Sequence, residues 1–196
     1  MKKQVMNFLS MALMALVLFS CGGGSGKKGS GGKSLFTPVS SGHPYEMLVV
    51  IDKDMWERPA GRALFNALDM DVPGLPQPER SFRISQIIPD KFERGFRIFR
   101  NIIDVDIQPI YTQPKLKYSR DSYASPQMIM TIQAPDEASF EEFVNQNKQV
   151  IVDFFTKAEM NRQINLLKEK YSDVVATKVG SMFGCDVRVP VGFERY

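Results

Sequence analysis

The first twenty residues have the pattern of an export signal, and this pattern decides which part of the chain has to fold. Lys2 and Lys3 precede an apolar run from Val5 to Phe19. That run is shorter than the roughly 20 predominantly apolar residues that a membrane-spanning helix requires. A basic start followed by a short apolar stretch is typical of a secretory signal peptide. We therefore predict that residues 1–20 are removed and that the fold lies behind them.

Cys21 stands at the first position after this signal, behind Leu18, Phe19 and Ser20. These four residues resemble the lipobox of bacterial lipoproteins, in which the cysteine thiol is acylated and the cysteine becomes the new N-terminus. Such a cysteine carries a diacylglycerol and commonly a further acyl chain such as palmitate, and two or more chains anchor a protein stably. We predict lipidation of Cys21, which would hold the protein on a membrane of the cell envelope.

Residues 21–34 separate this anchor from the rest of the chain. Behind Cys21 they contain seven glycines and no large apolar residue, a composition typical of a flexible linker. We interpret them as a Gly/Ser/Lys tether. From Leu35 onward the chain has 20 basic and 22 acidic residues. This part is therefore mildly acidic, which gives nucleic-acid binding no electrostatic support, and we expect no nucleic-acid partner.

Residues 35–196 predict a single layered α+β domain. Five short segments rich in β-branched or alternating apolar residues favour strands: 46–52, 82–88, 103–107, 127–133 and 186–190. We expect a mixed or antiparallel sheet of about five strands with helices packed on it, and a ferredoxin-like arrangement is one option. The chain stops shortly after the last predicted strand, so we expect a domain that is incomplete at its C-terminus.

Two helices are predicted in the first half of this domain. Pro59 suits a first helical position, so we expect a helix over residues 59–68, preceded by a turn in which Asp54 acts as a cap. Asp90 and Glu93 have the spacing of a capping box. The apolar residues around and after this box predict a helix with one apolar face: Phe92, Phe96, Phe99 and Ile103.

The second half predicts a loop and two further helices. Residues 112–126 are polar and carry prolines, which favours a loop. A long helical region begins at Asp136 or Ser139, where apolar residues recur at helical spacing. A last helix covers residues 174–183 and ends at Gly184, a residue typical of the position after a helix.

Few residues offer catalytic chemistry. His43 is the only histidine and lies at the end of the tether, so neither a Ser-His-Asp triad nor a histidine-based zinc site is indicated. Two carboxylate pairs are better candidates. Asp52 and Asp54 flank the end of the first strand, and Asp104 and Asp106 share one strand face. Each pair has a structural alternative, as a helix cap or as a solvated face. We expect no metal ion and no cofactor.

Two other features have an ordinary structural interpretation. No second histidine or other base is at hand to activate Cys185 as a nucleophile, and we expect it to be a small buried residue. Arg94, Arg97 and Arg100 recur at helical spacing. They either bind an anion or form the solvent-facing side of the predicted helix.

The strongest candidate for a binding surface is the segment from Tyr111 to Tyr123. Aromatic faces suit sugars and protein partners, and neighbouring cations add charge. Loops on a rigid scaffold commonly carry binding residues. We therefore propose four ligand-binding residues in this segment: Tyr111, Tyr118, Arg120 and Tyr123.

Several motifs in a fixed order resemble a lipoprotein family of the Bacteroidetes that is catalogued as a domain of unknown function. The resemblance spans most of residues 45–196, and these motifs carry it: Trp56, Gly61, Leu75-Pro76-Gln77, Glu79, Phe82, Arg100-Asn101-Ile102, Glu159, Arg162, Phe183-Gly184 and Val189-Pro190. Family members are longer and carry a second half with a Gly-rich Arg/Trp motif, so the resemblance implies that this chain corresponds to their N-terminal part. It brings no known activity and no catalytic residue.

These observations lead to three hypotheses about function. The first is a non-enzymatic envelope lipoprotein whose domain binds a protein or a cell-wall component. The second is an envelope hydrolase or transferase that uses paired carboxylates. The third is an assembly lipoprotein whose long helices pack against a partner. No acidic cluster follows Cys21, and acidic residues there favour export to the surface in Bacteroidetes-type envelopes. We therefore expect an outer-membrane protein that faces the periplasm.

Overall fold

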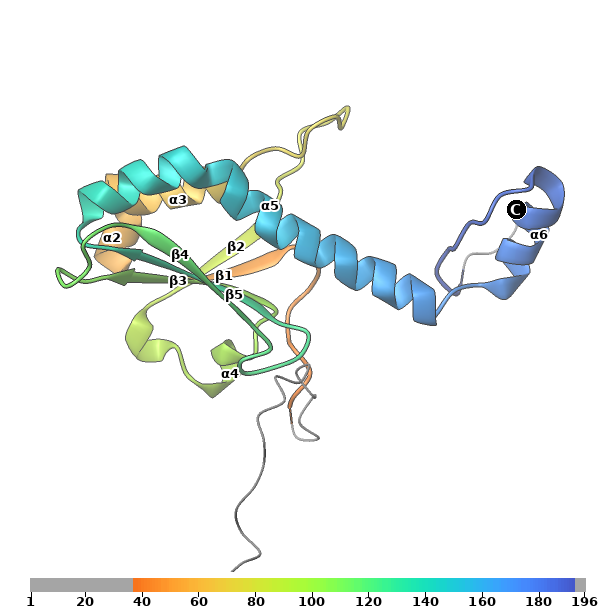
Figure 1. Ribbon diagram of the computed structural model, residues 1–196, viewed down its shortest axis with the longest axis horizontal. Coiled ribbons are helices and arrows are strands. Elements are labelled where there is room, and N and C mark those ends of the chain that lie inside the picture. The colour runs from red at the N-terminus through yellow and green to blue at the C-terminus, as the bar shows by residue number, and fades with distance from the viewer. Residues whose placement is uncertain (1–36, 193–196) are drawn as a thin grey trace, which may run out of the picture. The chain divides into compact units, whose positions relative to one another are not determined.

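A five-stranded mixed sheet forms the centre of the fold (Figure 1). The strands are β1 (Glu46–Val50), β2 (Arg83–Ile87), β3 (Asn101–Ile107), β4 (Lys115–Arg120) and β5 (Met128–Ala134). Their order is β2-β1-β3-β5-β4. β1 pairs in parallel with β2 and β3, β3 pairs in parallel with β5, and only β4 runs antiparallel to its neighbour. The α+β prediction is confirmed, but the three parallel pairings differ from the antiparallel sheet of a ferredoxin-like arrangement.

The computed structural model describes residues 37–192, so the predicted signal, Cys21 and tether lie outside the described residues. The helical elements are α2 (Lys53–Glu57), α3 (Pro59–Leu68), a 3-10 turn η1 (Pro89–Lys91), α4 (Arg94–Arg97), α5 (Glu137–Glu169) and α6 (Asp173–Phe183). None of the helices within residues 37–192 combines the length and the apolar character that crossing a membrane requires.

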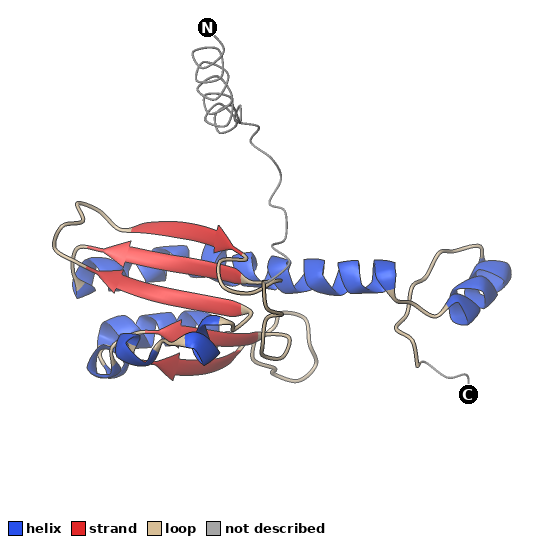
Figure 2. Ribbon diagram, turned by 90° about the horizontal axis from the view of Figure 1, so that it is seen from below, coloured by secondary structure: helices blue, strands red, loops and turns tan. Residues whose placement is uncertain are grey.

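α3 and α5 lie over one face of the sheet, whereas α4 lies on the other (Figure 1). The main core fills the space beneath α3 and α5, and its largest fully buried side chains come from these helices and the central strands: Phe140, Phe155, Met47, Leu64, Leu68, Ile103, Met130, Ile132 and Ile151. A smaller cluster on the opposite face contains Leu48, Val50, Ile87, Ile102 and Ile129, covered by Phe92 and Phe99. Seen from the α4 side, part of the sheet is left uncovered (Figure 2).

The predicted helix boundaries are confirmed at several points. α3 begins at Pro59 and ends at Leu68, as expected. α6 ends before Gly184, whose φ of 66° is the left-handed conformation that glycine adopts without strain. The cap before α3 is different from the prediction. The carboxylate of Asp52, not that of Asp54, accepts backbone hydrogen bonds at the start of α2, from the N–H groups of Asp54 and Met55.

The helix predicted from Asp90 is wrong. Glu93 is extended (φ −109°, ψ −172°), and only the four residues of α4 are helical. Phe96 is 44% exposed instead of facing the core. The segment has to carry the chain from β2 past β1 to β3, which pairs with β5 from Asn101 onward and with β1 from Ile102 to Asp104. This pairing outweighs the local helical spacing, because tertiary contacts override a weak intrinsic preference.

The fifth predicted strand is also wrong, and the true one lies in the predicted loop. Residues 186–190 have no regular secondary structure, although Val187 and Val189 alternate with polar residues. β4 instead covers Lys115–Arg120 and pairs with β5 at the edge of the sheet. Its sequence lacks an apolar pattern because Leu116 is its only aliphatic residue, and lysines are typical of edge strands.

Gly61 allows α2 and α3 to approach closely. A Cβ atom at this position would lie 2.4 Å from the Met55 carbonyl oxygen and 2.5 Å from the Trp56 Cα. We expect Gly61→Ala to lower the free energy of unfolding by about 1–3 kcal/mol, the usual cost of overpacking. Gly95→Ala is the matched control, since no atom lies within 4 Å of its added Cβ. Urea denaturation measures both, and equal stability of the two variants would contradict the prediction.

Candidate functional site

A polar cluster occupies the uncovered part of the sheet, near the carboxyl ends of β3 and β5. Asp104 lies opposite Thr131 in the strand register, and Asp106 lies opposite Gln133. Alternate residues of a strand point to the same face. The two aspartates therefore share the face of Ile102, opposite the face that α3 and α5 cover. In open sheets with parallel strands, ligands bind outside the carboxyl ends of the strands.

Asp106 is the centre of this cluster. Its carboxylate accepts hydrogen bonds from the Tyr111 hydroxyl, from Gln133 Nε2 at 2.6 Å and from Gln108 Nε2 at 2.7 Å. Gln133 is only 3% exposed, and its Oε1 has no hydrogen-bond partner within residues 37–192. A buried acceptor without a partner is uncommon in proteins. Gln133 Oε1 is therefore a buried acceptor in this cluster that no group of the described residues satisfies.

The two aspartates differ in acidity. Burial raises the pKa of Asp104, and the neighbouring charge of Asp106 raises it further. Burial also acts to raise the pKa of Asp106. The hydrogen bonds from Tyr111, Gln133 and Gln108, together with the charge of Lys117, outweigh that effect and leave the pKa of Asp106 below its ordinary value. Asp106 therefore loses its proton at a lower pH than Asp104 does.

Opposite pKa shifts predict opposite effects of two substitutions. A carboxyl group whose pKa is raised in the folded state stabilises the fold at a pH below its pKa in the unfolded state, about 3.9. This stabilisation is lost as the pH rises through the pKa of the folded state. A carboxyl group whose pKa is lowered in the folded state stabilises the fold at a pH above about 3.9. This stabilisation is lost as the pH falls through the pKa of the folded state. We expect Asp104→Asn to raise stability at pH 7 and Asp106→Asn to lower it. Both differences should shrink near pH 3, and urea denaturation at the two pH values tests this. Shifts of the same sign at pH 7 would contradict the assignment.

The carboxylates do not assemble into a metal centre. Within the part of the chain that the structure describes, no three His, Cys, Asp or Glu side chains are close enough together to hold a metal ion. Asp52 is engaged as the cap of α2, and Asp54 beside it is exposed. His43 is exposed before β1 and donates its backbone N–H to Glu46.

The four proposed ligand-binding residues are spread over the two faces of the sheet. Tyr111 belongs to the Asp106 cluster. Tyr118 stacks on Phe154 of α5 with ring centroids 4.7 Å apart, on the opposite face. Arg120 alternates with Tyr118 and shares that face. Tyr123 packs edge-on against Phe92, with centroids 6.3 Å apart. The expected single binding loop is therefore not formed, because β4 separates its residues.

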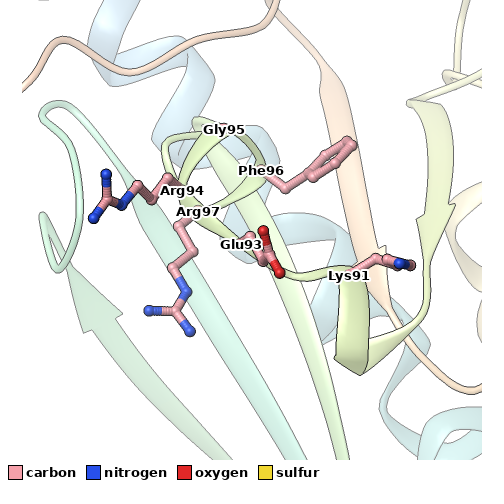
Figure 3. Close-up of a pocket in the computed structure, with 6 residues that line it drawn as sticks. All are labelled: Lys91, Glu93, Arg94, Gly95, Phe96 and Arg97. Carbon is pink, nitrogen blue, oxygen red and sulfur yellow. The ribbon is translucent and has the colours of Figure 1, made fainter.

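A second candidate is a pocket around α4 (Figure 3). It has a volume of about 510 Å³ and is lined by Lys91, Glu93, Arg94, Gly95, Phe96 and Arg97. Figure 3 shows the Arg94 and Arg97 side chains extending from α4 in different directions. The Arg97 guanidinium lies 5.5 Å from the Tyr123 ring centroid, and its Nε donates to the Phe92 carbonyl oxygen at 3.1 Å. Within the described residues, no carboxylate pairs with any of the three cations at 4.0 Å or less.

Arg100, the third arginine at helical spacing, has a structural role instead. Its guanidinium binds the fully buried Glu159 carboxylate of α5 at 2.7 Å. Arg162 binds the other oxygen of Glu159 at 2.7 Å and also donates to the Asn101 side chain at 2.8 Å. Asn101 in turn donates to Glu159 and to the Glu46 carbonyl oxygen. This buried ion-pair network fastens α5 to the start of β3 and β1.

Sequence reasoning missed the partners of Asp106 and misjudged Cys185. Cys185 is exposed, not buried, because the described residues behind α6, 184–192, contain no buried position. Gln108 was detectable, since it follows Asp106 at the two-residue spacing of one strand face. Gln133 was not, because its position beside Asp106 depends on the register between β3 and β5.

A family model described as a domain of unknown function (DUF8532) matches residues 40–168, more than half of the chain. The chain belongs to this family. The matched range contains the Asp106 cluster, the pocket around α4 and the whole buried ion-pair network, whereas α6 lies beyond it. No curated protein and no solved structure matches the chain. The family description states no activity.

Proposed function

We propose that this protein is a lipid-anchored lipoprotein of the bacterial envelope, on the outer membrane facing the periplasm, and that it works as a non-enzymatic module that binds a partner protein. The sequence around Cys21 supports the anchor. The partner-binding role is supported by one structural observation above all. Beyond Glu159, the described residues of α5 and α6 carry apolar side chains that no part of the domain covers.

The uncovered apolar surface begins in the second half of α5. Glu159 is the last buried residue among those the structure describes. Large apolar side chains follow that are 45–80% exposed within the two helices: Met160, Ile164, Leu166, Val174, Met182 and Phe183. An exposed apolar patch of this kind marks a protein interaction site in a soluble domain. Amphipathic helices bind partners by laying such a face into a groove.

Site-specific crosslinking in intact envelopes tests this proposal. A photoreactive amino acid at Phe183, in the full-length chain, should yield a discrete adduct with one protein. The same probe at Asn145, an exposed polar position of α5 over the core-facing half, is the matched control. Val174→Asp, introduced into the Phe183 probe chain, should remove the adduct without changing the melting temperature. Identical adducts from both probe positions, or none at all, would contradict the docking role.

The anchor is tested separately. Cys21→Ala should abolish incorporation of radiolabelled palmitate and move the protein out of the detergent phase, because the acylated thiol is gone. Cys185→Ala is the control, since this cysteine lies far along the chain and should not affect labelling. Unchanged labelling of Cys21→Ala would refute the lipoprotein assignment.

A second candidate function is an envelope hydrolase or transferase that uses Asp104 and Asp106. It is favoured by their shared strand face and their opposite pKa shifts, because a pair of titratable groups whose pKa values are moved apart by their surroundings is typical of an acid and a base. A panel of ester, phosphate and glycoside reporter substrates tests it. Turnover by the wild-type chain that Asp106→Asn removes would favour the enzyme over the binding module.

A further inference from the structure

The pocket around α4 lies beside the point where the chain enters the described domain. The Ser41 N–H donates to the Ile98 carbonyl oxygen at 2.8 Å, and the Arg100 N–H donates to the Ser41 carbonyl oxygen at 3.0 Å. A further bridge joins Val39 to Ser125. Residues 37–41 are thus attached to the α4 side of the sheet, opposite α3 and α5 (Figure 1).

This attachment has a consequence if Cys21 is lipidated, as the proposed function requires. Thr37 lies 16 positions after Cys21 in the sequence. For a Gly-rich chain of this length, polymer statistics give a root-mean-square span of roughly 20–24 Å, which is comparable to the size of the domain itself. The tether therefore limits how far residues 37–41, and the α4 side to which they are attached, can move from the lipid.

The pocket on that side suits an anionic surface. It is lined by three cations and one acid, and Phe96 among them is 44% exposed. Asp90 is exposed nearby but does not line the pocket. Lysine and arginine beside a membrane are attracted to anionic head groups, and an exposed phenylalanine can bury its ring at the boundary between head groups and acyl chains. The rest of the domain is mildly acidic, so these cations are locally concentrated against its overall charge.

We propose that the pocket around α4 is a membrane-docking site for anionic phospholipids, with Lys91 and Arg94 on opposite sides of the pocket attracting head-group phosphates and Phe96 entering the interface (Figure 3). The inference rests on the proposed lipid anchor but does not depend on the partner that binds α5 and α6. Docking would fix the orientation of the domain and keep the opposite face away from the lipid.

The experiment uses the full-length lipidated chain with Cys185→Ser and Phe96→Cys, labelled at residue 96 with an environment-sensitive fluorophore. It is reconstituted into vesicles of phosphatidylcholine alone or with phosphatidylglycerol. We expect a blue shift and quenching by brominated lipid only in the anionic vesicles. Lys91→Glu/Arg94→Glu should abolish both signals. Arg97 is left unchanged in this variant because its guanidinium holds the segment to Phe92.

The matched control is Lys148→Glu/Lys157→Glu, which makes the same change in net charge on exposed residues of α5, on the other face. It should keep the blue shift. Flotation of the protein with both kinds of vesicle reports the lipid anchor by itself. Flotation without any blue shift in anionic vesicles would overturn the docking site while leaving the anchor intact. A blue shift in vesicles of pure phosphatidylcholine, or the same blue shift in both charge variants, would also overturn the docking site. Failure to float would count against the anchor.

Discussion

Glu159→Gln is expected to lower the free energy of unfolding by about 3–5 kcal/mol, the usual cost of removing one partner from a buried ion pair. Glu159 is fully buried and binds Arg100 and Arg162 at 2.7 Å each, and the side chains of these arginines are only 15% and 10% exposed. Burial lowers the pKa of Arg162, which the Glu159 charge counteracts. Without that charge, two arginines stay largely buried next to each other. Guanidinium denaturation measures the loss.

Glu137→Gln provides the control for this prediction. Glu137 pairs with Arg58 at 2.8 Å, but both side chains are well exposed. Exposed ion pairs contribute about 0–1 kcal/mol, so this variant should lose little. A loss equal to that of Glu159→Gln would mean that the buried network is not what holds α5 to the sheet.

Phe155→Ala should also cost about 3–5 kcal/mol, as expected for truncating a fully buried phenylalanine. Its ring meets Phe154 and Phe82 edge-on, with centroids 4.9 Å and 6.4 Å away, and lies in the main core between α5 and the sheet. The substitution leaves a cavity that neighbouring strands cannot close. Far-ultraviolet circular dichroism measures the denaturation midpoints of both proteins. If the unfolding free energy has the same dependence on denaturant concentration in both, the midpoints give the difference in stability.

For Phe96→Ala, the structure predicts a different effect on stability from the one that the sequence predicts. Helical spacing places Phe96 on a buried face, whereas in the structure it is 44% exposed. We expect its truncation to change stability by less than about 0.5 kcal/mol, as for most surface substitutions. A large loss of stability in Phe96→Ala would favour the longer helix predicted from the sequence and contradict the short α4.

The elements that could be predicted are those whose local pattern agrees with their surroundings. Buried β1 is continuously apolar, and α3 begins at a proline and is amphipathic, so both were recognised. The segment after β2 was not, because its phenylalanines are spaced for a helix while the strand that follows needs Asn101 extended. β4 was missed because an edge strand has few apolar residues.

The candidate sites were predictable only in part. Asp104 and Asp106 could be placed on one face because a strand has a period of two. Their difference in acidity depends on Gln133 and Tyr111, which come from later parts of the chain. The sequence suggested an anion site or a solvent-facing position for Arg100 and gave no physical role to Glu159, so their pairing was not predicted. Arg100 and Glu159 are 59 residues apart in the sequence, and their contact at 2.7 Å appears only in the folded structure.

Arg100 connects the start of the described chain with the point where α5 leaves the core, and this has a mechanical consequence. Its backbone N–H bonds to Ser41, near the entry of the chain, while its side chain holds Glu159, where α5 leaves the core. Tension applied between an anchored N-terminus and a partner pulling on α6 would pass from Ser41 through Arg100 into α5. The load would then reach α5 through the backbone hydrogen bond and the ion pair of Arg100.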